Sequence, residues 1–170
     1  LDKPLSELRL VNVPLRNKAL EFADGGPLRA AAEDVLSCFV RACTAAPDAP
    51  AVRFADRSLS YRALSASAGS IASHLRSSCA GKADPLVGLC LSRSEHMIQS
   101  AFGVLAADAG YLPLDPSMPA ERLSFIVSDA QLTAVIADSE TFDTISGIVD
   151  CPVLNVDDLL DAPRLIEAPK

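Results

Sequence analysis

The side chains best suited to metal binding or general-base chemistry are two histidines, five cysteines and a short acidic run. His74 and His96 fall on expected helices without a cysteine or acidic partner at ligand spacing, which favours surface or capping roles. The cysteines are odd in number and form no C-x-x-C pair, so we expect buried reduced thiols rather than a zinc site or a disulfide framework. The acidic run is more typical of a solvated helix start than of a metal site. The cysteines are Cys38, Cys43, Cys79, Cys90 and Cys151, and the run is Asp157, Asp158 and Asp161.

Motifs for phosphate and acyl chemistry are absent from the 170 residues. The sequence contains neither G-x-G-x-x-G nor G-x-x-x-x-G-K-[ST], the glycine-rich patterns that place backbone N–H groups around phosphates. It also lacks the G-x-S-x-G elbow of serine hydrolases. Of its few lysines, Lys82 follows a glycine in an expected loop and is interpreted as a solvated charge. We therefore assign no catalytic, cofactor-binding or metal-binding residue to this chain.

Composition and charge exclude several partners. The formal net charge of −7 disfavours nucleic acid, whose phosphates would be repelled. The longest apolar run, residues 101–107, is far shorter than the roughly 20 residues of a membrane span, and the N-terminal residues lack the apolar core of a signal peptide. These features predict a cytoplasmic protein that binds neither nucleic acid nor membrane. With 49% hydrophobic residues and few aromatics, its core should be aliphatic.

The elements that must position any site begin after an expected interdomain linker, residues 1–27, which ends at a Gly-Gly-Pro sequence. A helix is expected from Leu28 to just before Pro47, and residues 51–61 predict a β-hairpin that turns at Ala55–Arg57. A second helix presents Leu64, Ala68, Ile71 and Leu75 on one face. The apolar run 86–91 predicts a strand covered on both faces. A helix from about Ser94 should direct five residues inward: Met97, Ile98, Ala101, Val104 and Leu105.

Strands are expected next at residues 111–114, 132–137 and 153–156, with a helix over 119–130 and a weaker one near 141–148. Alternating strands and helices predict an α/β fold, a largely parallel sheet flanked by helices, with the hairpin in addition. Pro113 cannot donate to a sheet ladder, so its strand should be short or lie at an edge. Pro119 suits the first position of the following helix, whose packed face is Leu123, Ile126, Val127 and Ala130.

Several segments together resemble nonribosomal peptide synthetase adenylation domains. "LSYRAL" is similar to the first core motif of that family, "LCLSRSEHMI" to its strand-R-S-x-E segment, and "GYLPLDPSMPAERL" to its second core motif. "PDAPAV" matches the usual lead-in, and the order and spacing agree over residues 28–160. Departures from the patterns occur at Ala63, His96, Ala106, Asp108 and Gly110. The matching residues are Leu59, Ser60, Tyr61, Leu64, Arg93, Ser94, Tyr111, Pro113, Asp115, Pro116, Pro119, Glu121 and Arg122.

The resemblance implies a fold and a reaction. Residues 28–170 would form the N-terminal part of an adenylate-forming enzyme, and the parent domain would use ATP and Mg²⁺ to convert an amino acid into an aminoacyl adenylate for a carrier-protein thiol. In the family, the phosphate loop, the amino-acid pocket, the magnesium-binding acid and the catalytic lysine all come from later sequence. The chain is therefore expected not to be catalytic alone. Its expected partners are the remainder of the adenylation domain and neighbouring condensation and carrier domains.

Two alternatives remain. The departures from the motifs favour a naturally truncated, non-catalytic remnant that acts as a spacer or docking element, and an unrelated small α/β binding module is the third reading.

Two residues also carry structural hypotheses. Tyr61 should place its ring in the core and use its hydroxyl in a structural hydrogen bond, and Arg93 should tie loops together through an ion pair. If these residues belong to a larger domain, some strand edges and apolar helix faces should be uncovered and favour self-association.

Overall fold

The computed structural model describes residues 12–24 and 34–160, and the chain divides into two compact units, Leu1–Glu33 and Asp34–Lys170. The described part of the first unit is helix α1, Val13–Ala23. Its start is encoded locally, because the Asn12 side chain accepts a hydrogen bond from the N–H of Leu15 at 2.9 Å and a proline occupies the first turn. The sequence pattern predicted only a linker here, since the apolar residues follow no clean period.

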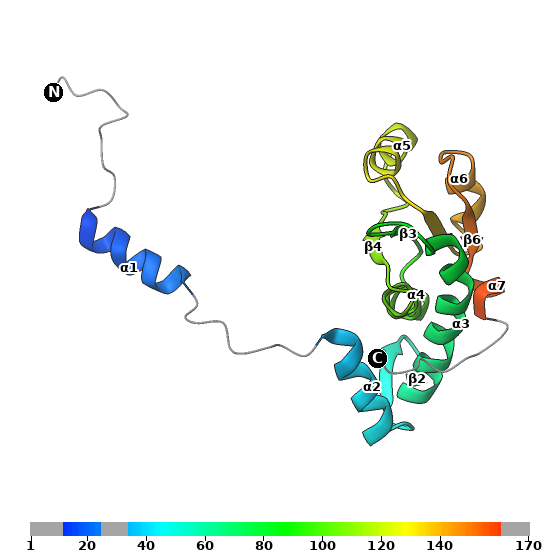
Figure 1. Ribbon diagram of the computed structural model, residues 1–170, viewed down its shortest axis with the longest axis horizontal. Coiled ribbons are helices and arrows are strands. Elements are labelled where there is room, and N and C mark those ends of the chain that lie inside the picture. Colours follow the sequence, from blue (N-terminus) through cyan, green and yellow to red (C-terminus); the bar gives the residue numbers. More distant parts are fainter. Residues whose placement is uncertain (1–11, 25–33, 161–170) are drawn as a thin grey trace. The chain divides into compact units, whose positions relative to one another are not determined.

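The second unit contains a four-stranded parallel sheet, a hairpin and six helices among its described residues (Figure 1). The sheet order is β4-β3-β5-β6, with every pair parallel, and β1 pairs with β2 in an antiparallel hairpin. The predicted fold class is confirmed. The elements are α2 Val35–Ala45, β1 Pro50–Phe54, β2 Arg57–Ser60, α3 Tyr61–Cys79, β3 Leu86–Cys90, α4 Glu95–Ala106, β4 Gly110–Pro113, α5 Ala120–Asp129, β5 Ala134–Ala137, α6 Phe142–Ser146, β6 Val153–Asn155 and α7 Val156–Leu160.

Two hydrophobic clusters lie on opposite faces of the sheet because side chains alternate along each strand. Val87 and Leu89 of β3 belong to the cluster that includes residues of α3, α4 and α7. Cys90 of the same strand belongs to the second cluster, with residues of α5 and α6. Helices therefore cover both faces, as Figure 1 shows, which explains why β3 is apolar along its whole length. No helix in residues 12–24 and 34–160 has the length and apolar character that crossing a membrane requires.

Strand β4 lies at the edge of the described sheet, as its proline predicted. The N–H groups of Gly110 and Leu114 donate to Pro85 and Leu89 at 2.8 and 2.9 Å, so alternate residues of β4 direct their N–H groups toward β3. Pro113 directly precedes Leu114, so its nitrogen points away from β3, toward the outer side of the strand. Its missing N–H costs no bond to β3 and removes a donor from the free edge, which limits pairing with another strand.

Helix α4 packs closely on α3 and turns a polar face inward. Gly103 permits the approach, because a Cβ there would lie 2.6 Å from the Cβ and Cγ2 atoms of Ile71. The inward positions of α4 are Glu95, Gln99, Ser100, Gly103 and Val104. The prediction that Ile98 points inward is wrong, since 39% of this residue is exposed.

Two predicted boundaries also shift. The helix expected from Leu28 begins at Val35 among the described residues, after an Asp34 N-cap, and residues 28–33 lie outside the described part. Pro119, expected as the first residue of α5, is its N-cap with extended backbone (ψ 141°). Because proline has no N–H and disfavours helical geometry in the residue before it, either position tolerates it.

Candidate functional site at the carboxyl edge of the sheet

The loops that follow the parallel strands meet at one edge of the sheet, where open α/β proteins bind ligands. Asp138, directly after β5, occupies the centre of this edge and is 7% exposed. Its carboxylate accepts hydrogen bonds from the N–H groups of Ser92 at 2.6 Å, Glu140 at 3.1 Å and Thr141 at 3.0 Å. The carboxylate therefore joins the end of β3 to the loop that leads from β5 to α6.

Asp138 has a lowered pKa. Burial is the largest single influence and raises the pKa, but the hydrogen bonds from Ser92 and Thr141 together outweigh it. The Thr141 hydroxyl lies 2.9 Å from one carboxylate oxygen of Asp138 and 2.6 Å from the carbonyl oxygen of Cys90, and can donate to one of them at a time. The carboxylate is thus held ionised and saturated with donors, which suits a structural role.

Further acidic groups surround this carboxylate. The Ser92 hydroxyl donates to Glu140 at 2.8 Å, and the Ser139 hydroxyl donates to Asp157 at 3.0 Å. Asp115, which follows β4, accepts hydrogen bonds from the hydroxyl and N–H of Ser117, and these bonds lower its pKa. The edge is therefore mainly anionic, a poor environment for the phosphates of a nucleotide.

Arg93 supplies positive charge at this edge. It is exposed, and its charge is the smallest of the influences on the pKa of Asp115. Arg93 forms no ion pair with another residue of the ranges 12–24 and 34–160, so the predicted pair is not found there. An ion pair is present two positions further along the chain. Glu95, 7% exposed, contacts the guanidinium of Arg57 from the hairpin at 2.9 Å. Sequence reasoning missed this pair, because partners 38 positions apart give no periodic signal.

The residues of this edge do not fit the ATP and Mg²⁺ that the resemblance implies. Within the described ranges, no group of three or more His, Cys, Asp or Glu residues could hold a metal ion. The start of α3 is also unsuited to an anion, because its N–H groups already donate within the chain. Those of Tyr61, Arg62 and Ala63 donate to Ala49 O at 3.0 Å, Pro47 O at 2.8 Å and Ser60 Oγ at 3.2 Å.

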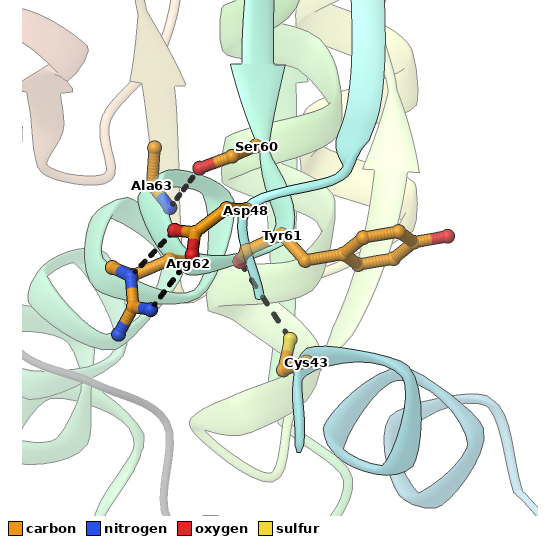
Figure 2. A network of polar contacts seen from close by, with 6 residues as sticks. All are labelled: Cys43, Asp48, Ser60, Tyr61, Arg62 and Ala63. Atoms are coloured by element: carbon orange, nitrogen blue, oxygen red, sulfur yellow. Dashed lines mark hydrogen bonds and ion pairs between the residues drawn. The ribbon is translucent and has the colours of Figure 1, made fainter. Parts of the chain in front are cut away.

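The first resemblance motif, residues 59–64, forms this helix start (Figure 2). Ser60 is the N-cap of α3, and Leu64 is 2% exposed in the core. The Cys43 thiol donates to the carbonyl oxygen of Tyr61 at 3.6 Å, which links α2 to α3. Figure 2 shows the Tyr61 ring directed away from the exposed Asp48–Arg62 pair, and that ring lies 6.1 Å from the Phe39 ring.

Replacing Ser60 with alanine is expected to lower the free energy of unfolding by about 1 kcal/mol, because the N–H of Ala63 loses its acceptor. Ser60→Asp, which keeps a capping oxygen, should retain most of the stability. Asp48→Asn is the matched control at the same helix end. It removes only an exposed ion pair, so its unfolding midpoint should not change measurably. Urea denaturation followed by circular dichroism measures all three variants, and equal losses for Ser60→Ala and Ser60→Asp would contradict the capping role.

The second motif, residues 110–123, forms the edge strand, the turn and the start of α5. Tyr111 is 42% exposed on β4, and the Asp115–Ser117 hydrogen bonds fix the turn that contains Pro116. Glu121 lies in the first turn of α5, and Arg122 lies 5.8 Å from the centre of the Phe125 ring. The two motifs therefore lie at different places in the fold. Ser94, from the segment between them, is the N-cap of α4, but its side chain makes no capping hydrogen bond.

The remaining candidates from the sequence are scattered. All five cysteines are free, but only Cys79 and Cys90 are buried, so the expectation of buried thiols fails for the other three. Burial raises the pKa of the Cys90 thiol. His74 is exposed and lies 3.0 Å from the carbonyl oxygen of Ser70, as expected of a surface histidine. Asp157 and Asp158 lie in the first turn of α7, which agrees with a helix start, whereas Asp161 lies outside the described residues.

Comparison with known proteins agrees with this architecture. The family described as "AMP-binding enzyme" matches residues 39–168. Surfactin synthase subunit 3 of Bacillus subtilis (strain 168) is 33% identical over 139 residues, which are 82% of this chain and 11% of that protein. The nonribosomal peptide synthetase FmoA3, bound to alpha-methyl-L-serine-AMP, superposes with a TM-score of 0.70 and 26% identity over 85% of this chain and 16% of its own. A four-domain nonribosomal peptide synthetase bound to AMP and glycine gives 0.64 and 30% identity, over 75% of this chain and 9% of its own.

The chain therefore belongs to the AMP-binding enzyme family. Its residues correspond to part of an adenylation domain of the nonribosomal peptide synthetase type, as the motifs implied. The chain spans only 2–11% of the length of the curated relatives that it matches.

Proposed function

We propose that this chain forms a structural layer of an adenylation domain in a cytoplasmic, multidomain synthetase of secondary metabolism. The complete domain would join an amino acid to ATP, release pyrophosphate and pass the aminoacyl group to the thiol of a carrier protein. The observation that carries the proposal is the match over residues 39–168 to an AMP-binding family, together with the similarity to surfactin synthase subunit 3. The anionic carboxyl edge supports a scaffolding role, because groups that bind ATP and Mg²⁺ would have to come from elsewhere in the domain.

Pyrophosphate exchange tests this proposal. The 170-residue chain, given ATP, Mg²⁺ and a panel of amino acids, should catalyse no exchange above background. The full-length polypeptide in which these residues occur should catalyse exchange with one amino acid or a few related ones. Robust exchange by the 170 residues alone would refute the scaffolding role.

A non-catalytic role is the second candidate, favoured by the departures at Ala63, His96, Ala106 and Asp108. It predicts a folded full-length polypeptide that gives no exchange with any amino acid. Intact circular dichroism together with absent exchange would decide in favour of this candidate.

A further inference from the structure

Helix α4 directs polar side chains into the protein near its N-terminal end. Glu95 and Gln99 are only 7% and 4% exposed, although a surface helix normally turns carboxylate and amide groups toward water. The two residues are four positions apart, so they lie on the same face of the helix, one turn from each other. We call this place the polar α3–α4 corner, and its members are Arg57, Ala63, Ser67, Glu95 and Gln99.

Each of these two side chains has one bonded and one unbonded polar atom. Oε1 of Glu95 contacts the guanidinium of Arg57 at 2.9 Å, and Nε2 of Gln99 donates to the Ser67 hydroxyl at 2.8 Å. Oε2 of Glu95 and Oε1 of Gln99 are buried and have no hydrogen-bond partner among the described residues. The Ser100 hydroxyl shares this property, but a serine inside a helix can turn toward the carbonyl oxygen one turn earlier. The two acceptor oxygens have no such remedy and require a donor.

The hydrogen bonds around Ser67 fix the orientation of the Gln99 amide. The Ser67 hydroxyl donates to the carbonyl oxygen of Ala63 at 3.0 Å, and a hydroxyl has a single hydrogen to donate. It must therefore accept from Gln99, which turns Nε2 toward α3 and leaves Oε1 on the other side of the amide. An amide turned the opposite way would place an acceptor against an oxygen whose hydrogen is already used. Gln99 therefore presents an acceptor, and not a donor, to the rest of the corner.

The side chains that α3 contributes to the corner are small. Ala63 and Ser67 are four positions apart and share the face of α3 that Gln99 contacts. Ala63 stands where the first core motif has glutamate, so the start of α3 carries less side-chain volume here than that motif does. A small ligand with hydrogens to donate is what the two oxygens and the short side chains accommodate.

The charges of the corner select among such ligands. The Glu95 carboxylate is paired with the Arg57 guanidinium, so the one negative and the one positive group of the corner already balance. A bound cation would bring an additional, uncompensated charge into a buried place, which is costly. A water molecule is neutral, and its two hydrogens serve two acceptors at once. Charge balance therefore favours water over a cation.

We propose that the polar α3–α4 corner binds one internal water molecule, which donates one hydrogen to Oε2 of Glu95 and the other to Oε1 of Gln99. The water connects the ion pair of the hairpin to the hydrogen bonds of α3. The hairpin, α4 and α3 are then joined by a continuous series of polar contacts that runs from Arg57 to the carbonyl oxygen of Ala63. This ligand is structural, and its binding does not depend on whether the parent domain catalyses adenylation.

A crystal structure of the full-length polypeptide, at a resolution that shows ordered water, tests the site. A density peak should lie within about 2.5–3.0 Å of both Oε2 of Glu95 and Oε1 of Gln99. Gln99→Met keeps the length of the side chain but removes the amide, so the peak should lose at least about half of its occupancy. Gln131→Met is the matched control, because Gln131 is exposed at the end of α5, and it should leave the peak unchanged.

Three results would overturn the proposal. The first is a corner without a peak, including one in which the Gln99 amide has turned and donates directly to Glu95. The second is a peak that keeps its full occupancy in Gln99→Met, since the water would then be held by other groups. The third is a cation: crystals soaked in rubidium chloride, whose ion scatters anomalously, should show no anomalous peak at the site. If Gln99→Met does not fold, the peak and the rubidium soak of the unsubstituted protein still decide the question.

Discussion

Replacing Asp138 with alanine should lower the free energy of unfolding by about 3–5 kcal/mol, the largest loss expected for a single polar side chain in the described part of this protein. Three backbone N–H groups, from Ser92, Glu140 and Thr141, lose a charged acceptor at once. Asp138→Asn keeps one acceptor oxygen and should cost about half as much. Asp129→Asn, on the exposed side of α5, serves as the control and should change little.

The stability that Asp138 supplies should depend on pH in one direction. Its pKa in the folded protein is lowered, so folding favours the ionised carboxylate. The contribution is therefore complete above the ordinary aspartate pKa of about 4 and is lost as the pH falls through the folded-state pKa. The difference between the unsubstituted protein and Asp138→Asn should be constant from about pH 5 to 7 and shrink in more acidic solution. Urea unfolding at each pH measures it, and a difference that grows on acidification would contradict the assignment.

Replacing Gly103 with valine should destabilise the protein by about 3 kcal/mol, because the new side chain enters the contact between α3 and α4. A Cβ at this position would lie 2.6 Å from two atoms of Ile71 and 3.1 Å from the Ala68 carbonyl oxygen. Gly103→Ala should cost less, because alanine regains about 1 kcal/mol of helix propensity.

Gly147 provides the control for this substitution. A Cβ there would meet only carbonyl oxygens at 3.7 Å, so Gly147→Ala should be neutral. The cost of Gly103→Ala should also fall in part in an Ile71→Ala background, because that change removes the Ile71 Cγ2 atom from the contact and leaves its Cβ. Equal costs in both backgrounds, measured by chemical denaturation, would contradict close packing as the cause.

Much of the fold was predictable because its signals are local. Alternation, helical periodicity and proline positions predicted the strands, the hairpin turn and the edge location of β4, and the structure confirms them. The facing of α4 was not predictable. Most residues of this helix are apolar, so periodicity predicted that the stripe with Ile98 faces the core. In the structure, the side that carries Gly103 faces inward, because glycine permits α3 to approach closely there. The size of one residue and the position of a neighbouring helix decided the orientation.

The polar centre of the carboxyl edge was missed for a different reason. Asp138 and Ser92 are 46 residues apart, and although Ser92 lies in the strand-R-S-x-E segment, no sequence pattern connects it to Asp138. The carboxylate gains its role only when β3 and β5 lie side by side. Arg57 and Glu95 form their ion pair under the same condition, once the hairpin lies against α4.

The same separation affects the order of events during synthesis. β3 and its edge neighbour β4 leave the ribosome first, but β5, which pairs with the other side of β3, follows later. At about 5–20 residues per second, the 46 residues from Ser92 to Asp138 take roughly 2–9 s to translate. For those seconds the apolar central strand has at least one open flank, and a nascent-chain chaperone that binds extended apolar segments would find its target there.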